Sequence, residues 1–368
     1  MELDGDLLAT QAIARENAAD LRSRALAVDA EPDRMEPHVG SPGLQAIQKV
    51  AQPGMRCLET TVALIELARG DAGLVLACPG PALAGVIVAV LGTAAQQEQL
   101  AAAVANGSSW AFFAVTEPHA GSDVARMRTE LRPDGCGGYL LHGAKRYIGN
   151  GSRASAGVVF ARTGPGPLSL RAALIEVPAA NLRAEPLDMI GLRGARISHL
   201  SFDGVQVPAS ALLGAHLPPV RRGMWGAIQA FNRVRVQVAA MAAGTALAVY
   251  DYVRAERTRP GADDAAILDA TGIRIETVRR LIYRAAVDID AGPRRGYLAS
   301  IAKLEAVSLA VEVCGRLPAL LGRGALLEHP LLEKWWRDCA AFEFMEGTST
   351  IQRLNVAQGY LKGQETYG

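Results

Sequence analysis

The sequence has almost no excess charge and few cysteines, and each shortage excludes a class of function. Its 38 basic and 37 acidic side chains leave a net charge of +1, so we expect neither nucleic acid nor an anionic membrane surface as a partner. The five cysteines form no CxxC pair and are odd in number, which argues against a disulfide framework or a zinc site. We therefore expect reduced thiols in a cytoplasmic protein.

Long apolar runs and metal-ligand patterns are also missing. The most apolar stretch, 74–91, contains Pro79, Gly80 and Pro81, so we expect no membrane insertion. No basic-then-apolar signal segment opens the chain. The six histidines have no ligand spacing such as H-x-x-x-H, so no metal is expected.

The residue pattern changes twice along the chain, which predicts three domains of an α+β protein. Residues 1–108 are rich in good helix formers and predict an N-terminal helical domain. Residues 109–216 contain short apolar runs separated by glycine, proline, aspartate and asparagine, which predicts a central antiparallel β domain. Residues 217–368 return to helical periodicity and predict a C-terminal four-helix bundle.

One carboxylate stands in a break between two helical patterns near the end of the chain. We predict a helix that stops at Gly347 and restarts behind Thr348 and Ser349 as caps. Glu346 then follows the largely apolar run 342–345, where lost hydration would raise its pKa and make it a better base near neutral pH. The restarting helix would offer free N–H groups to an anionic or carbonyl oxygen. Composition alone favours the alternative, a solvated glutamate at a helix end.

The segment FMEGTSTIQR, residues 344–353, resembles the C-terminal signature of the acyl-CoA dehydrogenase family. The resemblance implies an FAD-dependent enzyme that dehydrogenates an acyl thioester, held on coenzyme A or a carrier protein, between its α and β carbons. It implies that Glu346 takes the α-proton while the β-hydrogen leaves as hydride to flavin N5. It also implies that Gly347 contacts substrate and that Thr348 contacts FAD.

A second segment, AVTEPHAGSD at 114–123, resembles another signature of the same family. In that resemblance Val115 and Thr116 contact the flavin ring, where preorganised donors stabilise the charge of reduced flavin. Ser122 falls near the flavin phosphate or the pantetheine arm of the substrate. The same resemblance adds two FAD-binding residues, Phe113 and Gly121. Without the longer match, such a loop is more often only a cluster of turn residues.

A third segment, HGAKRYIGNG at 142–151, resembles the family pattern Gly-x-Lys-x-Trp-Ile-Thr-Asn-Gly. Tyr147 takes the aromatic position and can stack on the flavin. Gly149 takes the threonine position and can offer only its backbone N–H. Some oxidase-type relatives are similar in having glycine there, so the electron acceptor is expected to be either a flavoprotein or O₂.

The segment FNRVRVQVAAMAAG, residues 231–244 of the helical stretch 224–257, resembles the family helix whose arginine, here Arg235, reaches the pantetheine or nucleotide end of the thioester. A surface arginine on a core helix is an equally weighted alternative. A branch of the family has its catalytic glutamate at the position of Val234, which cannot take a proton, so Glu346 is left as the candidate base. The family has an arm that holds the FAD adenine of a neighbouring subunit, and this chain keeps its arginine as Arg257 but lacks its aromatic residue. A later glycine-rich segment of the family, also implied to bind FAD, is matched only around Gly322. A homodimer or homotetramer is implied.

Two rival functions remain open. The chain is short for the family, and trimmed relatives act on acyl groups tethered to carrier proteins in polyketide or peptide pathways, as dehydrogenases or oxidases. A non-catalytic relative that has lost FAD is the more distant rival, and the retained Glu346 argues against it. Ser300 and Lys303 spell the S-x-x-K of acylating serine enzymes, but the partner motifs are missing. We interpret that pair as an exposed helix surface.

Overall fold

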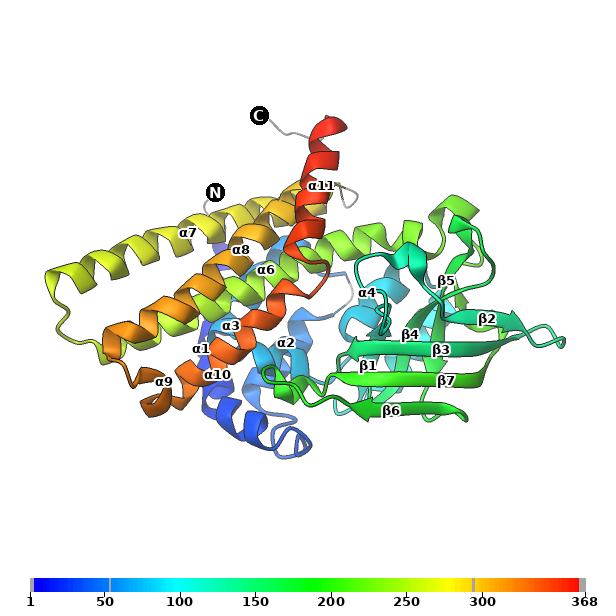
Figure 1. Cartoon of the computed structure of the whole chain (residues 1–368), viewed down its shortest axis with the longest axis horizontal. Coiled ribbons are helices and arrows are strands. Elements are labelled where there is room, and N and C mark those ends of the chain that lie inside the picture. Colours follow the sequence, from blue (N-terminus) through cyan, green and yellow to red (C-terminus); the bar gives the residue numbers. More distant parts are fainter. Residues whose placement is uncertain (1–2, 53, 293–294, 364–368) are drawn as a thin grey trace. The chain divides into compact units, whose positions relative to one another are not determined.

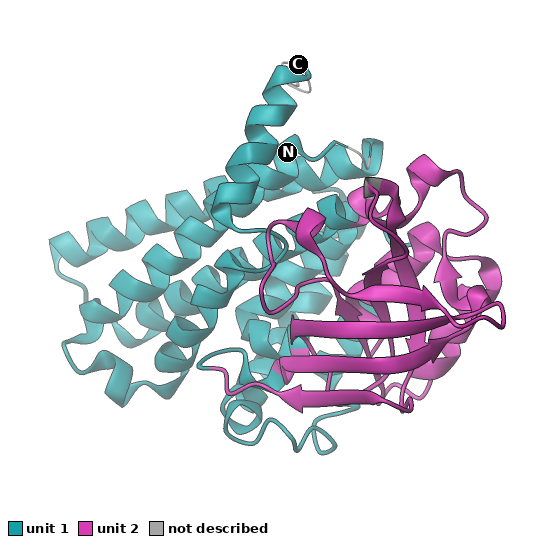
Figure 2. Cartoon of the chain, turned by 45° about the vertical axis from the view of Figure 1, so that its right-hand side comes forward, with its two compact units in different colours: residues 1–76, 190–194, 231–368 teal, residues 77–189, 195–230 magenta. Residues whose placement is uncertain are grey.

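A computed structural model describes residues 3–52, 54–292 and 295–363 (Figure 1). It shows N-terminal helices, a central sheet and C-terminal helices, which confirms the predicted α+β class. The chain divides into two compact units (Figure 2), and each is described by itself. Unit 1 comprises Met1–Leu76, Ile190–Gly194 and Phe231–Gly368, and unit 2 comprises Ala77–Met189 and Ala195–Ala230. The three-domain division at 108 and 216 stays a prediction.

Unit 1 is helical. Its packing pairs include α7 with α8, α8 with α11, and α1 with both α2 and α10. Asp4 caps α1 by accepting the Leu7 N–H at 2.9 Å, and Ser41 caps α2. The helices that contribute to this unit are α1 (Gly5–Ala30), α2 (Pro42–Val50), α3 (Cys57–Ala77), α6 (Gly223–Glu256), α7 (Ala262–Ala291), α8 (Tyr297–Arg316), α9 (Ala325–Glu328), α10 (Pro330–Cys339) and α11 (Ser349–Leu361).

Helix α6 is long and apolar enough to cross a membrane by length and composition. However, 72% of its apolar window is buried inside the structure, as in the core helix of a soluble protein. Its buried alanines and valines face the neighbouring helices instead of a lipid phase. The pattern therefore fits a core helix.

Unit 2 is a sheet in the strand order β6-β7-β3-β2-β4-β5-β8, with β1 paired to β4. Most pairs are antiparallel as predicted, but β1 runs parallel to β4, and β2 meets β4 in parallel at Glu130 and Arg162. The sheet is mixed because the long connection from β1 to β4 contains β2 and β3, which lets β4 return in the direction of β1. The elements are α4 (Ala82–Leu91), α5 (Ala94–Val104), β1 (Trp110–Ala114), β2 (Glu130–Pro133), β3 (Tyr139–Ile148), β4 (Ala154–Arg162), β5 (Leu170–Glu176), β6 (Leu182–Pro186), β7 (Ser198–Val207) and β8 (Leu212–Leu213).

Both faces of β4 are buried in unit 2, and a close contact between Phe112 and Gly157 matches the register of β1 against β4. Phe112 of β1 is 1% exposed, and a Cβ added to Gly157 of β4 would lie 2.4 Å from its ring. Only glycine allows that close approach. The hydrophobic cluster that contains Phe112 also includes Leu131, Leu141, Val159, Leu200 and Phe202.

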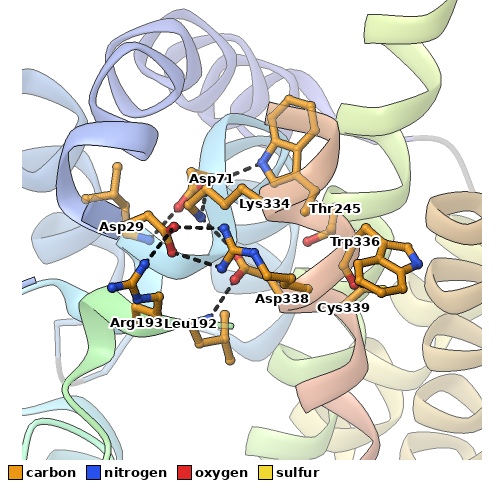
Figure 3. Close-up of polar contacts among 12 residues, drawn as sticks. Asp29, Asp71, Leu192, Arg193, Thr245, Lys334, Trp336, Asp338 and Cys339 are labelled. Carbon is orange, nitrogen blue, oxygen red and sulfur yellow. Dashed lines mark hydrogen bonds and ion pairs between the residues drawn. The ribbon is translucent and has the colours of Figure 1, made fainter. Parts of the chain in front are cut away.

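A buried group of charges joins α3 to α10 in unit 1 (Figure 3). The Lys334 ammonium lies 2.6 Å from a carboxylate oxygen of Asp71 and 2.6 Å from one of Asp338, and each of the three residues is at most 3% exposed. Trp335 donates its indole N–H to Asp71, and the Leu192 N–H donates to Asp338. Burial opposes the charge on Lys334, but attraction to the two carboxylates outweighs it and raises the lysine's pKa.

A second, partly exposed ion pair reinforces the same junction. Arg337 of α10 binds Asp29 of α1 at 2.8 Å and donates to the Ile190 carbonyl at 2.6 Å. Arg193 approaches Asp29 to 3.7 Å, and Figure 3 shows the two side chains pointing toward each other. The short segment 190–194 is therefore held against α10 by both groups of charges.

Replacing Lys334 with methionine should destabilise the protein strongly, because two carboxylates would remain buried without a counterion. We expect a loss of about 3–5 kcal/mol in the free energy of unfolding, measured by urea denaturation. The exposed Lys49→Met change is the control, with an expected effect within about 0.5 kcal/mol. A Lys334→Met loss as small as that of the control would contradict this role.

Candidate functional site

The turn that carries Glu346 has an unusual backbone. Helix α10 ends at Cys339, a 3₁₀ turn spans Ala340–Glu343, and α11 begins at Ser349. The prediction of a helix that continues to Gly347 is therefore wrong. Both Glu346 (φ 51°) and Gly347 (φ 93°) are left-handed. Glycine adopts this conformation freely, but for glutamate it costs free energy, so neighbouring groups must hold the turn.

Side chains from three helices hold this turn through its carbonyl groups. Gln352 of α11 donates from Nε2 to the carbonyls of Glu346 at 3.0 Å and Gly347 at 2.9 Å. Lys303 of α8 donates from Nζ to the Gly347 carbonyl and, at 3.3 Å, to that of Glu343. Arg235 of α6 donates to the Glu346 carbonyl at 3.4 Å. The carboxyl group of Glu346 thus projects from a backbone fixed at several points.

The side chain that caps α11 belongs neither to Thr348 nor to Ser349, the two predicted capping residues. Thr348 is the N-cap residue, but its side chain makes no capping hydrogen bond. Glu343 takes that role: its carboxylate accepts the Ser349 N–H at 2.8 Å and the Ser349 hydroxyl at 2.5 Å. The sequence prediction of a Thr/Ser side-chain cap is therefore wrong. Because the Ser349 N–H is already bonded, it is not one of the free donors that we expected at this helix start.

The electrostatics of the turn suit a base that works near neutral pH. Burial raises the pKa of the Glu346 carboxyl, and the positive charges of Arg235 and Lys303 oppose that rise. Burial lowers the pKa of Lys303 to about 8, against the attraction of Glu343 and Glu346. Burial favours the protonated form of this carboxyl group, and the two positive charges favour its ionised form, so the group is suited to accept and release a proton.

Unit 2 brings several predicted cofactor-binding residues together where β1 and β3 end. The Arg146 N–H donates to the Thr116 carbonyl at 2.9 Å, and the buried Lys145 donates to the Val115 carbonyl at 2.8 Å. Tyr147 is left-handed (φ 63°) and 57% exposed, and the Arg146 guanidinium lies 5.4 Å from its ring centroid. The two sequence segments that resemble flavin-binding signatures are therefore neighbours in this unit.

The remaining predicted residues of unit 2 differ in how accessible they are. Gly121 and Ser122 are exposed, whereas Phe113 is partly buried and packs edge-on against Phe160 with centroids 5.8 Å apart. A Cβ added to Gly149 would meet nothing within 4 Å. An accessible flat aromatic beside open backbone, together with hydroxyl and N–H donors, fits the ring of a flavin.

The loop between these two segments depends on a pair that the sequence analysis missed. Lys145 is fully buried and lies 3.1 Å from the carboxylate of Glu117, which also accepts the N–H groups of Arg128 and Thr129 at 2.8 Å. These bonds close the loop 117–129, which carries Gly121 and Ser122. The sequence does not predict this ion pair, because Lys145 and Glu117 are distant in sequence.

Two predicted FAD-binding residues of unit 1 lie elsewhere. Arg257 follows the last turn of α6, roughly 33 Å along the helix from Arg235 at 1.5 Å per residue, and its guanidinium lies 2.7 Å from Asp264. Gly322 is left-handed (φ 117°) and follows the 3₁₀ turn Leu317–Leu321. That both residues bind FAD, Arg257 at the adenine of a neighbouring subunit, stays a prediction.

Ser300 and Lys303 lie in a different environment from the one predicted. We expected an exposed helix surface, but Ser300 is 0% and Lys303 is 1% exposed. The signal was present, because Lys303 lies at helical spacing from Ala299 and Ala306, which are buried on the same face of α8. No sequence pattern of this kind predicted that Gln352 and Glu343 hold the turn.

Most of the chain matches known proteins of one family. Residues 112–205 match the family model for the middle domain of acyl-CoA dehydrogenases, and residues 221–361 match that for the C-terminal domain. The chain is 31% identical over 330 residues to a probable medium-chain specific acyl-CoA dehydrogenase 2, mitochondrial, of Caenorhabditis briggsae, a match that covers 85% of this chain and 78% of the relative.

Two solved structures have the same fold. The glutaryl-coenzyme A dehydrogenase complex with glutaryl-CoA has a TM-score of 0.85 at 23% identity, covering 98% of this chain and 96% of that one. The prolyl acyl carrier protein oxidase AnaB has a TM-score of 0.82 at 25% identity, covering 98% of this chain and 100% of that one.

The pH dependence of stability should reveal the raised pKa of the partly buried Glu346 carboxyl group. Because its pKa is raised in the folded state, the group contributes stability below its unfolded pKa and loses that contribution as pH rises through the folded value. The Glu346→Gln variant should therefore gain stability relative to the unaltered protein as the pH is raised from about 4 through the folded-state pKa. Urea denaturation across this range, with the exposed Glu305→Gln as control, measures the difference. A difference that does not change with pH would contradict the desolvated state of Glu346.

Proposed function

This chain belongs to the acyl-CoA dehydrogenase family of FAD-dependent oxidoreductases that act on CH–CH bonds, and we propose from this premise that Glu346 is its catalytic base. The observation that carries the proposal is the position of the Glu346 carboxyl group on a fixed left-handed turn. Burial raises the pKa of this group, and the positive charges of Arg235 and Lys303 oppose that rise. The reaction is the α,β-dehydrogenation of an acyl thioester.

The residues of unit 1 have separate tasks in this proposal. A carboxylate oxygen of Glu346 takes the α-proton of the thioester and becomes a neutral acid, which burial favours. Gln352, Lys303 and Arg235 hold the backbone, so the carboxylate meets the α-carbon in one orientation. Gly347 and Arg235 are the proposed substrate contacts of this unit.

FAD, when bound, supplies the acceptor for the β-hydrogen and its electron pair. We propose that Val115, Thr116, Tyr147 and Gly149 hold its ring, and the open backbone at Gly149 beside an exposed aromatic supports this assignment. Ser122 would serve the flavin phosphate or the substrate arm. The same proposal includes the remaining predicted residues: Phe113, Gly121, Arg257, Gly322 and Thr348.

A second candidate keeps the chemistry but changes the tether and the electron acceptor. Gly149 offers no hydroxyl, and nothing in this unit fills the space beside it. The similarity to AnaB, a prolyl acyl carrier protein oxidase, supports a substrate tethered to a carrier protein and O₂ as acceptor. The first candidate uses a coenzyme A thioester and an electron-transferring flavoprotein. In both, we propose a cytoplasmic homodimer or homotetramer.

Anaerobic titration with acyl-CoA and acyl-carrier-protein thioesters tests the function. We expect one thioester to bleach the oxidised flavin band of the purified protein. Glu346→Gln should keep FAD but reduce the rate of bleaching by about 10²- to 10⁴-fold or more, as expected for loss of a general base. The exposed Glu305→Gln variant is the matched control and should keep the rate. Full activity of Glu346→Gln would overturn the assignment.

Reaction in air separates the two candidates. If open space at Gly149 admits O₂ to the flavin, the protein should release peroxide during turnover. Gly149→Thr, which has room for its side chain, should then lower peroxide release by about tenfold, or about 1.4 kcal/mol in activation free energy. No peroxide from the unaltered protein, with turnover only through a flavoprotein acceptor, would exclude the oxidase candidate.

A further inference from the structure

We propose that Lys303 is a positioning residue for the base: it closes the left-handed turn that carries Glu346, and its positive charge favours the ionised carboxylate. The inference rests on the proposed role of Glu346 as the base. It goes beyond that role because it assigns to one buried side chain on α8 the control of the pH range in which the base is active.

The contacts of Lys303 bracket Glu346 on both sides. Its ammonium donates to the carbonyl of Glu343, before the base, and to that of Gly347, after it. The side chain reaches the turn from α8 and is 1% exposed, so water does not compete for these bonds. One charged group therefore joins the two ends of the turn and helps to hold the left-handed backbone at Glu346.

The pairing of Lys303 differs from that of the other two buried lysines. Lys145 lies 3.1 Å from Glu117, and Lys334 lies 2.6 Å from both Asp71 and Asp338. Within the described part of the chain, no carboxylate oxygen lies within 4 Å of the Lys303 ammonium. Buried charges are costly unless they are compensated. For Lys303 the compensation comes from carbonyl dipoles and from carboxylates at longer range.

The charged groups that act on Lys303 come from the three elements around the turn. They are Glu343 on the 3₁₀ turn, Glu346 itself and Arg235 on α6. Burial lowers the pKa of Lys303 to about 8, so the side chain remains mostly cationic at neutral pH. Among the influences on Glu346, burial raises the carboxyl pKa, whereas Arg235 and Lys303 lower it. Removal of the Lys303 charge should therefore raise the pKa of the base further.

Gln352 offers a matched control within the same turn. Its amide donates to the carbonyls of Glu346 and Gly347, and it is 0% exposed. It holds the turn as Lys303 does, but it carries no charge. A purely structural loss should affect both variants in the same way, whereas a loss of charge should change the pH profile only for Lys303.

The experiment measures flavin reduction in the holoenzyme under anaerobic conditions at low thioester concentration, where the rate constant reports the free enzyme. The variants are Lys303→Met and Gln352→Met, compared with the unaltered protein from about pH 5 to about pH 9. For Lys303→Met we expect the acidic limb of the profile to move upward by about one pH unit, which lowers the rate by about tenfold at pH values well below the midpoint of that limb. For Gln352→Met we expect a lower rate with the acidic limb unmoved. An unmoved acidic limb in Lys303→Met would overturn the proposal.

Folding and function are controlled separately. Lys303→Gln keeps a donor for the Gly347 carbonyl without the charge, and its acidic limb should move as in Lys303→Met. The visible spectrum reports bound FAD in each variant, and failure of both Lys303 variants to fold with FAD would overturn the positioning role in favour of a structural one. The proposed function fails on other results: no thioester reduces the unaltered protein, or Glu346→Gln keeps its rate.

Discussion

A glutamate held on left-handed backbone is the constraint on which the site depends. Glu346 at φ 51° is unfavourable by itself, and Gly347 after it extends the same conformation. The turn persists because buried donors from α6, α8 and α11 bind its carbonyls. This arrangement separates two tasks: the backbone is fixed by hydrogen bonds, and the carboxylate remains free for chemistry with its pKa raised by burial.

The position of the turn that carries Glu346 depends on the position of α10. That helix is anchored by Lys334 between Asp71 and Asp338, and Asp338 directly precedes the residue at which α10 ends. The 3₁₀ turn that follows carries Glu343, whose carboxylate caps α11. The buried charges thus fix the start of the segment, and the cap fixes its end. A charged cluster in the core has a cost in desolvation, but it places this segment in one position.

The sequence was sufficient for the fold class, the family and the candidate base, because each rests on local pattern or on a contiguous signature. Helical periodicity and short alternating strands marked the layers, and the signature around Glu346 marked the residue that we propose as the base. It was not sufficient for the parallel pairing of β1 with β4, for the Glu343 cap, or for Lys303 as a buried residue. These features depend on partners distant in sequence or on a side chain that is usually exposed, and tertiary contacts decide them.

The most direct test of the account is hydrogen exchange at the α-carbon of a thioester analogue that has no β-hydrogen and so cannot be oxidised. In D₂O, the FAD-loaded protein should exchange the α-hydrogen of this analogue for deuterium, as followed by mass spectrometry, because Glu346 removes that proton reversibly. Glu346→Gln should show no exchange above the background without protein. Exchange by Glu346→Gln at the rate of the unaltered protein would show that another group is the base and would contradict the account.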